Sequence, residues 1–134
     1  MKNTLILTRD EYVATDKAIE LFKANKRGIF FSQKQTAEEL VSVIGKDFST
    51  SIVTDYSSYD EVRYKIENTK TEVNFIVLDF IQLFKQGSLK QLMEFLNEKG
   101  IKLIAISWVH EEGQIRVISD ENISVLFELI INVS

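Results

Sequence analysis

Polar side chains follow several apolar runs of the sequence, at the positions where a parallel sheet usually binds its ligands. In an open parallel sheet, ligands collect beyond the carboxyl ends of the strands. The segments to inspect are therefore residues 8–10, 32–35, 55–57, 79–82 and 108–111. They supply the carboxylates of Asp10, Asp55 and Asp79, together with His110. These groups could converge on a cation, but Asp10 and Asp55 also stand where helix N-caps belong, and capping is the commoner use of Asp there.

Neither hydrolase chemistry nor a metal site follows from these residue types. His110 is the chain's one histidine and precedes Glu111 and Glu112 in a polar stretch, a setting more typical of a solvated loop residue than of a base or ligand. No G-x-S-x-G elbow accompanies the serines. Without cysteine there is neither a disulfide framework nor a thiolate metal site, which fits a reducing compartment. We therefore predict no catalytic residue and no bound metal.

Short apolar runs alternate with amphipathic stretches, and this alternation predicts the elements that would position the polar groups. The expected strands cover residues 4–7, 28–31, 51–54, 74–80, 102–108, 115–118 and 125–133. Several of these runs are apolar on both faces, as a strand buried in a parallel sheet should be. The last run has only a short lead-in and is expected to form an edge strand.

Helical signals lie between the expected strands. Ala14, Ala18, Leu21 and Phe22 share one helix face. Capping boxes begin at Thr36, Ser58 and Ser88, and Gly45 and Gly100 stand where the first and third of these helices should stop. Strand–helix alternation of this kind predicts an α/β fold with a mostly parallel sheet and helices on both faces.

The bulk composition limits the class of protein. At 134 residues without linker composition or repeats, residues 1–134 are expected to form a single domain, and 45% hydrophobic with 27% charged residues is a globular composition. The net charge of −4 argues against a broad phosphate-gripping face, so direct nucleic-acid binding is doubtful. The apolar run near the N-terminus is far too short for a signal peptide or a membrane span, which predicts a cytoplasmic protein with no membrane partner.

Read in order, the strand ends resemble the C-terminal motor domain of DnaB-type replicative helicases, a three-layer RecA-like, P-loop NTPase-like fold. Residues 27–41 (RGIFFSQKQTAEELV) are similar to the family's V-x-F-F-S-L-E-M-x-A-E-Q-L segment. Residues 75–83 (FIVLDFIQL) resemble its Walker B strand, and residues 101–107 (IKLIAIS) resemble the strand that follows. Weaker matches at residues 51–66 and after Ser119 keep the family's order, so the resemblance covers nearly the whole chain.

The departures from the family pattern fall on the chemistry. The segment from Thr8 to Lys17 stands where the family has G-x-x-x-x-G-K-[ST], yet no glycine precedes Gly28. A P-loop needs glycine so that successive backbone N–H groups can wrap a phosphate. Asp10 and Glu11 would instead place negative charge at the helix N-terminus that receives phosphate, and Lys17, about two turns into the helix, comes too late to replace the P-loop lysine.

The remaining catalytic positions are also altered. By the resemblance, Lys34 replaces the water-activating glutamate and Trp108 replaces the phosphate-sensing glutamine; the indole either fills the nucleotide space or is a core or rim aromatic. Asp79 remains and would serve as a polar strand-end residue or helix cap. The vestigial site region is then made up of Asp10, Lys17, Lys34, Asp79, Gln82 and Trp108.

The resemblance implies a preserved scaffold without its ATPase, with no cofactor and no enzyme activity expected. Such a domain would act by binding protein, with a hexameric helicase or a second copy of itself as candidate partners, and a phage or bacterial origin would suit so reduced a core. Two alternatives stay open: a nucleotide-binding or ATPase domain with an unorthodox site around Asp79, Asp55 and Lys34, and a receiver-like signalling domain phosphorylated on Asp79.

Overall fold

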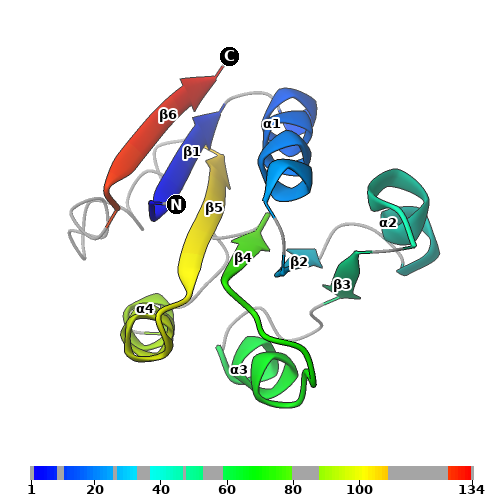
Figure 1. Ribbon diagram of the computed structural model, residues 1–134. Coiled ribbons are helices and arrows are strands. Elements are labelled where there is room, and N and C mark those ends of the chain that lie inside the picture. Colours follow the sequence, from blue (N-terminus) through cyan, green and yellow to red (C-terminus); the bar gives the residue numbers. More distant parts are fainter. Residues whose placement is uncertain are drawn as a thin grey trace.

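Strands and helices alternate along the chain, as the hydrophobic pattern predicts (Figure 1). A computed structural model describes residues 2–8, 11–25, 27–32, 37–46, 48–52, 59–79, 88–108 and 127–133. The elements are β1 (Thr4–Thr8), α1 (Glu11–Ala24), β2 (Gly28–Ser32), α2 (Ala37–Ile44), β3 (Ser49–Ile52), α3 (Asp60–Glu67), β4 (Phe75–Leu78), α4 (Ser88–Lys99), β5 (Lys102–Trp108) and β6 (Leu129–Val133). Within the described residues no helix is long and apolar enough to cross a membrane.

The strands form one parallel sheet in the order β3-β2-β4-β5-β1-β6. This order places β5 between β1 and β4, and puts β6 at one edge, where the sequence predicted an edge strand. It differs from the 2-1-3-4-5 order of flavodoxin-like and receiver domains, so the topology argues against the receiver-like alternative. The three-layer RecA-like α/β class is confirmed.

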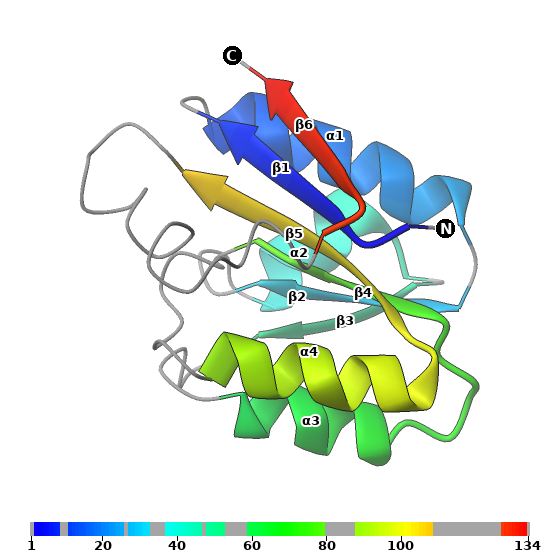
Figure 2. The same ribbon diagram turned by 90° about the vertical axis from the view of Figure 1, so that its left-hand side faces the viewer.

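Two apolar cores lie on opposite faces of the sheet, each covered by a pair of helices (Figure 2). From β1 to β3 the successive strands lie progressively closer to the β3 edge of the sheet, and α1 and α2 connect them. From β3 to β5 the strands progress in the opposite direction, connected by α3 and α4. Because such connections are right-handed, the two pairs of helices lie on opposite faces. On the central strand β4, Phe75 and Val77 join the α1–α2 core, while Ile76 and Leu78 join the α3–α4 core. All four residues are buried, which explains why this strand is apolar without alternation.

Aromatic packing fills the α1–α2 core. Phe22 of α1 lies 5.5 Å from the Phe30 ring, 5.6 Å from Phe75 and 5.3 Å from Phe48, measured between ring centroids. Gly28 pairs with Phe75 across β2 and β4, and a Cβ atom at Gly28 would overlap the Phe75 ring. Glycine at this position is therefore required by the close approach of an aromatic ring rather than by a turn.

Several predicted boundaries are confirmed and others are wrong. Gly45 (φ 114°) and Gly100 (φ 69°) take the left-handed conformation that ends a helix, as predicted. The third strand begins at Ser49 rather than at residue 51, because its mostly polar residues leave no apolar run to mark its start, and residues 53 and 54 lie outside the described residues. Ser58 is not the N-cap of α3: the cap is Tyr59, without a side-chain hydrogen bond, and two acidic residues follow in the first turn. The predicted strand at 115–118 lies outside the described residues.

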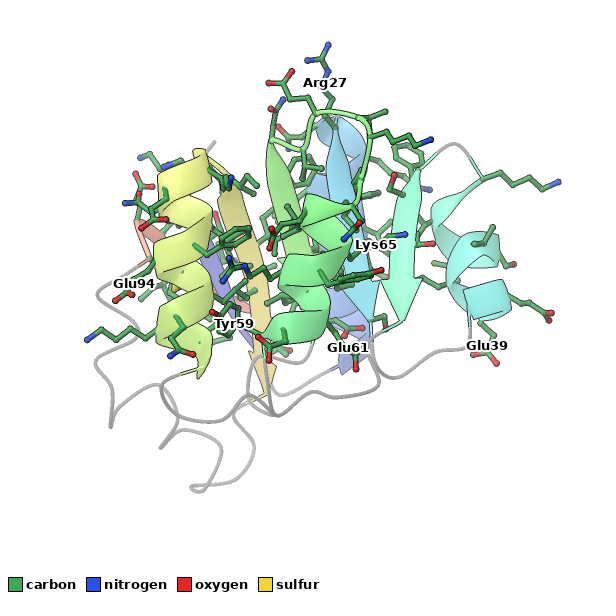
Figure 3. All side chains as sticks on the ribbon, turned by 90° about the horizontal axis from the view of Figure 1, so that it is seen from below. Arg27, Glu39, Tyr59, Glu61, Lys65 and Glu94 are labelled. Atoms are coloured by element: carbon green, nitrogen blue, oxygen red, sulfur yellow. The ribbon has the colours of Figure 1, made fainter. Side chains whose placement is uncertain are left out.

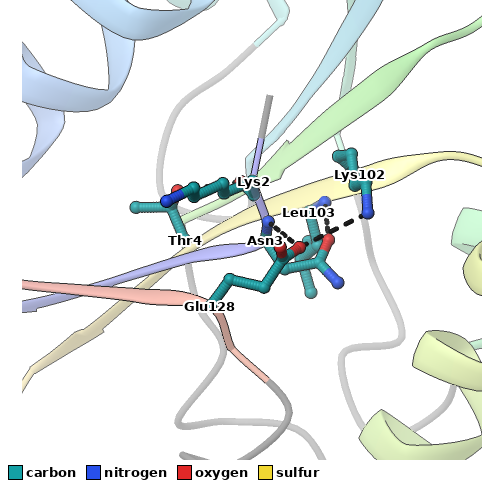
Figure 4. Close-up of polar contacts among 6 residues, drawn as sticks. All are labelled: Lys2, Asn3, Thr4, Lys102, Leu103 and Glu128. Atoms are coloured by element: carbon teal, nitrogen blue, oxygen red, sulfur yellow. Dashed lines mark hydrogen bonds and ion pairs between the residues drawn. The ribbon is translucent and has the colours of Figure 1, made fainter.

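At the amino end of the sheet, polar contacts join β1, β5 and the segment before β6 (Figure 4). The Asn3 side-chain carbonyl accepts a hydrogen bond from the Leu103 backbone N–H at 2.9 Å. The Glu128 carboxylate accepts from the Asn3 backbone N–H at 3.2 Å and from the Lys102 ammonium at 3.4 Å. These contacts hold the pKa of Glu128 below its ordinary value, and the hydrogen bond from the Asn3 backbone N–H is the largest cause.

Candidate functional site

Buried polar side chains mark the carboxyl ends of three strands. Of the four buried polar residues in the described part of the chain, Thr8 ends β1, Ser32 ends β2 and Asp79 directly follows β4; the fourth, Thr4, lies at the amino end of β1. Burying a polar group is costly unless it is hydrogen-bonded, so such groups gather where a fold needs them. The carboxyl edge of the sheet is therefore the candidate site, as the sequence predicted.

Ser32 and Asp79 form the centre of this site. The Ser32 hydroxyl donates to Asp79 Oδ2 at 2.6 Å, and the two side chains are 0% and 4% exposed. The length is that of a hydrogen bond to a carboxylate, which is shorter and stronger than one between neutral groups. The Asp79 backbone N–H also contacts the Phe31 carbonyl of β2 at 3.4 Å. Asp79 is thus a strand-end residue tied to the neighbouring strand β2, in line with one of the two roles expected for it.

The connection from β1 to α1 is short. β1 ends at Thr8 and α1 begins at Glu11, which leaves Arg9 and Asp10 to join them. A P-loop motif spans eight positions and needs several loop residues to surround a phosphate with backbone N–H groups. A two-residue connection does not supply them. The lack of glycine before Gly28 and the short connection point the same way, and the loss of a P-loop stays a prediction.

Of the other predicted site residues, only Lys17 and the backbone of Trp108 lie in the part of the chain that the structure describes. Lys17 is the seventh residue of α1, about 9 Å along the axis from the start of the helix. Its ammonium group lies 3.6 Å from Glu20 Oε1 on the same helix, so it is a surface residue, as predicted. Trp108 ends β5 in register with Thr8, but its side chain is outside the description. Asp10, Lys34, Asp55, Gln82 and His110 lie outside the described residues.

Acidic residues open two of the helices that begin at the carboxyl edge of the sheet, α2 and α3. Glu38 and Glu39 lie in the first turn of α2, and Asp60 and Glu61 lie in the first turn of α3. Figure 3 shows Glu39 and Glu61 at this end of the strands and Arg27 at the opposite end. Helix N-termini attract anions, but carboxylates already placed there compete with a phosphate and repel it. This edge therefore disfavours polyphosphate.

Two surface hollows are lined by residues of α2 and α3 in the described part of the chain. One of about 700 Å³ runs along α2 and is lined by Glu38, Val41, Ser42, Gly45 and Lys46. A smaller one, about 330 Å³, is lined by Asp60, Glu61, Tyr64 and Lys65 of α3. Among the described residues there is also no group of three or more acidic, His or Cys side chains that could hold a metal ion.

The sequence identified the strand ends but not the contact that joins them. Ser32 and Asp79 are 47 residues apart, and each was a candidate because it follows an apolar run. Their pairing depends on β2 lying next to β4, which the order of elements along the chain does not specify.

No protein-family model matches the chain, and no curated protein matches it significantly.

Proposed function

We propose that this chain is a non-catalytic RecA-like domain that acts by binding protein, and that it regulates a replicative helicase or a related ATPase in DNA replication. The two-residue connection between β1 and α1 carries the proposal, because it removes the phosphate-binding loop on which phosphoryl transfer depends. The resemblance to DnaB-type motor domains supplies the class of partner.

The state of Asp79 supports the same conclusion. In the resembling family this aspartate serves a nucleotide-bound metal ion, whereas here its Oδ2 accepts the Ser32 hydroxyl in a site that is 4% exposed or less. An acidic rim at the starts of α2 and α3 adds repulsion against ATP. The hydrogen bond of Asp79 to a neighbouring strand supports a role for this carboxylate in stabilising the fold rather than in a reaction.

Titration calorimetry with Mg-ATP and Mg-GTP tests the loss of nucleotide binding. We expect no saturable heat at nucleotide concentrations up to about 1 mM, whereas a Kd near 1 µM would correspond to about −8 kcal/mol and be readily measured. Lys17→Ala is the control, since Lys17 lies on the α1 surface and should not alter the result. Micromolar binding by the wild-type chain would overturn the proposal and favour the unorthodox nucleotide site.

The choice of partner has its own test. The purified chain is mixed with a purified bacterial replicative helicase, and complex formation is followed by size-exclusion chromatography with the ATPase rate measured in parallel. We expect co-elution and a changed ATPase rate. Separate elution with an unchanged rate would remove the helicase from the proposal.

A further inference from the structure

We propose that the edge of β6 facing away from β1, which pairs with no other strand among the described residues, binds β6 of a second copy of this chain, so that the sheet continues across a two-fold axis. Among the described residues, β6 pairs with β1 on one side and with no strand on the other (Figure 1). An exposed edge strand presents backbone N–H and C=O groups that another strand can bind. This interface rests on the proposed function, because it specifies the surface through which a non-catalytic domain would bind protein.

Apolar exposure is concentrated on this strand. The large hydrophobic side chains that are exposed in the described part of the chain are Val43, Tyr64, Leu129 and Ile130, and two of these are neighbours on β6. Leu129 is 43% exposed and Ile130 is 42% exposed. Successive residues of a strand point to opposite faces, so both faces of the sheet stay incompletely covered at this edge. A neighbouring strand would cover both side chains at once.

The direction of the backbone groups selects the residues that would pair. The Asn3 backbone carbonyl accepts from the Glu128 N–H at 2.9 Å and from the Leu129 N–H at 3.1 Å. The paired strand begins with Leu129 in register with Thr4, so within β6 it is Leu129 that directs its hydrogen-bonding groups toward β1. Alternate residues of a strand face the same neighbour, and Ile131 therefore also bonds β1. Ile130 and Asn132 direct their N–H and C=O groups to the edge facing away from β1.

An antiparallel pair centred on Ile131 satisfies these groups. Ile130 then lies opposite Asn132 of the partner subunit, and Asn132 lies opposite Ile130 of the partner subunit, with both bonds exchanged in each pair. Ile131 lies opposite the partner's Ile131, at the symmetry axis. The same patch serves both copies, as an isologous two-fold interface requires.

Charge at this edge allows a second copy to approach, although each chain carries a net charge of −4. Leu129–Val133 contains no charged residue and no proline, the usual means by which an edge strand resists pairing. Glu128, the carboxylate that directly precedes β6, is compensated by the Lys102 ammonium at 3.4 Å. Self-pairing therefore brings no uncompensated like charge from β6 or Glu128 across the axis.

Sedimentation equilibrium of the wild-type chain from about 1 µM to about 200 µM is the first test, and we expect a concentration-dependent dimer. Ile130→Lys places two ammonium groups diagonally across the axis, and Asn132→Pro removes an edge-facing N–H while keeping the bonds to β1. Both variants should be monomeric at concentrations at which the wild type is dimeric. Val43→Lys, a change at a similarly exposed residue of α2, should leave the dimer intact. Circular dichroism establishes that each variant is folded.

Hydrogen exchange decides the question without any variant. The Ile130 and Asn132 amides should exchange more slowly at high protein concentration than at low concentration, whereas the Ile131 amide, bonded to β1, should be protected at both. A chain that stays monomeric throughout the range overturns the interface, and so does a dimer that both variants keep. A monomer without nucleotide binding refutes the interface alone, whereas nucleotide binding refutes the proposed function alone.

Discussion

Replacing Ser32 with alanine tests whether the Ser32–Asp79 hydrogen bond stabilises the carboxyl edge of the sheet. The bond is 2.6 Å long, and its partners are 0% and 4% exposed, so water has little access to replace the lost hydroxyl. A hydrogen bond to a charged group contributes about 1.5–3 kcal/mol, and this is the expected loss in the free energy of unfolding. For a chain of this length the loss corresponds to a decrease in Tm of roughly 5–12 °C.

Urea denaturation at neutral pH measures this loss, provided that the slope of the free energy against urea stays constant. Ser42→Ala is the matched control: Ser42 is exposed on α2, and its replacement should change stability by less than about 0.5 kcal/mol. If Ser32→Ala is as mild as the control, the hydrogen bond does not stabilise this edge of the sheet, and our account of Asp79 fails.

Asp79→Asn separates a structural role from a functional one. Residues kept for catalysis or ligand binding often cost stability, so replacing them commonly stabilises a protein. If the carboxylate stabilises the fold, its replacement should instead lower the free energy of unfolding, here by about 1–3 kcal/mol. The double variant with Ser32→Ala should be less destabilised than the sum of the single changes, because each removes the same bond. A stabilised Asp79→Asn protein would point back to a ligand site.

Three further predictions concern the parts of the fold that support the sheet. Phe22→Ala should lower the free energy of unfolding by about 3–5 kcal/mol in urea denaturation, because three aromatic rings contact Phe22, and a change below about 1 kcal/mol would contradict that packing. Gly28→Ala should cost about 1–3 kcal/mol and lower the Tm measured by circular dichroism, because the new methyl group meets the buried Phe75 ring; an unchanged Tm would show that the ring moves aside freely. The pKa of Glu128 is lowered in the folded state, so its contribution is present above the ordinary value of 4.5 and is lost as pH falls through the folded pKa. Glu128→Gln should therefore reduce stability at pH 7 and differ less from wild type in acid, and a difference that grows on acidification in urea titrations would contradict this.

The sequence predicted the elements best where burial is complete. β4 is apolar at every position because both of its faces are covered, and such an unbroken apolar run can be recognised from the sequence alone. β3 is at the opposite edge from β6 and has a mostly polar sequence, so its start was misplaced by two residues. The N-cap of α3 was misplaced because Ser58 offered a capping-box pattern that competes with the acidic pair following Tyr59.

The candidate site was predicted as a set of positions, whereas its contacts depend on strand order. Apolar runs located Ser32 and Asp79 at strand ends, but nothing in their spacing indicates that β2 lies beside β4. The role of Gly28 was missed for the same reason: it depends on the register that sets Gly28 opposite Phe75. Local patterns encode burial and helix ends, and tertiary pairings between distant residues leave no comparable local signal.

The strand order also bears on the structural role proposed for Asp79. Neighbouring strands lie about 4.8 Å apart, and β5 separates β1 from β4, so the ends of β1 and β4 are about 10 Å apart. A ligand can join them only if the connection after β1 extends over the end of β5, and a connection of two residues is too short to do so. The Asp79 carboxylate bonds Ser32 of β2, on the side away from β1. The short connection after β1 and this direction of the carboxylate both support the proposal of a domain that binds protein rather than one that catalyses a reaction.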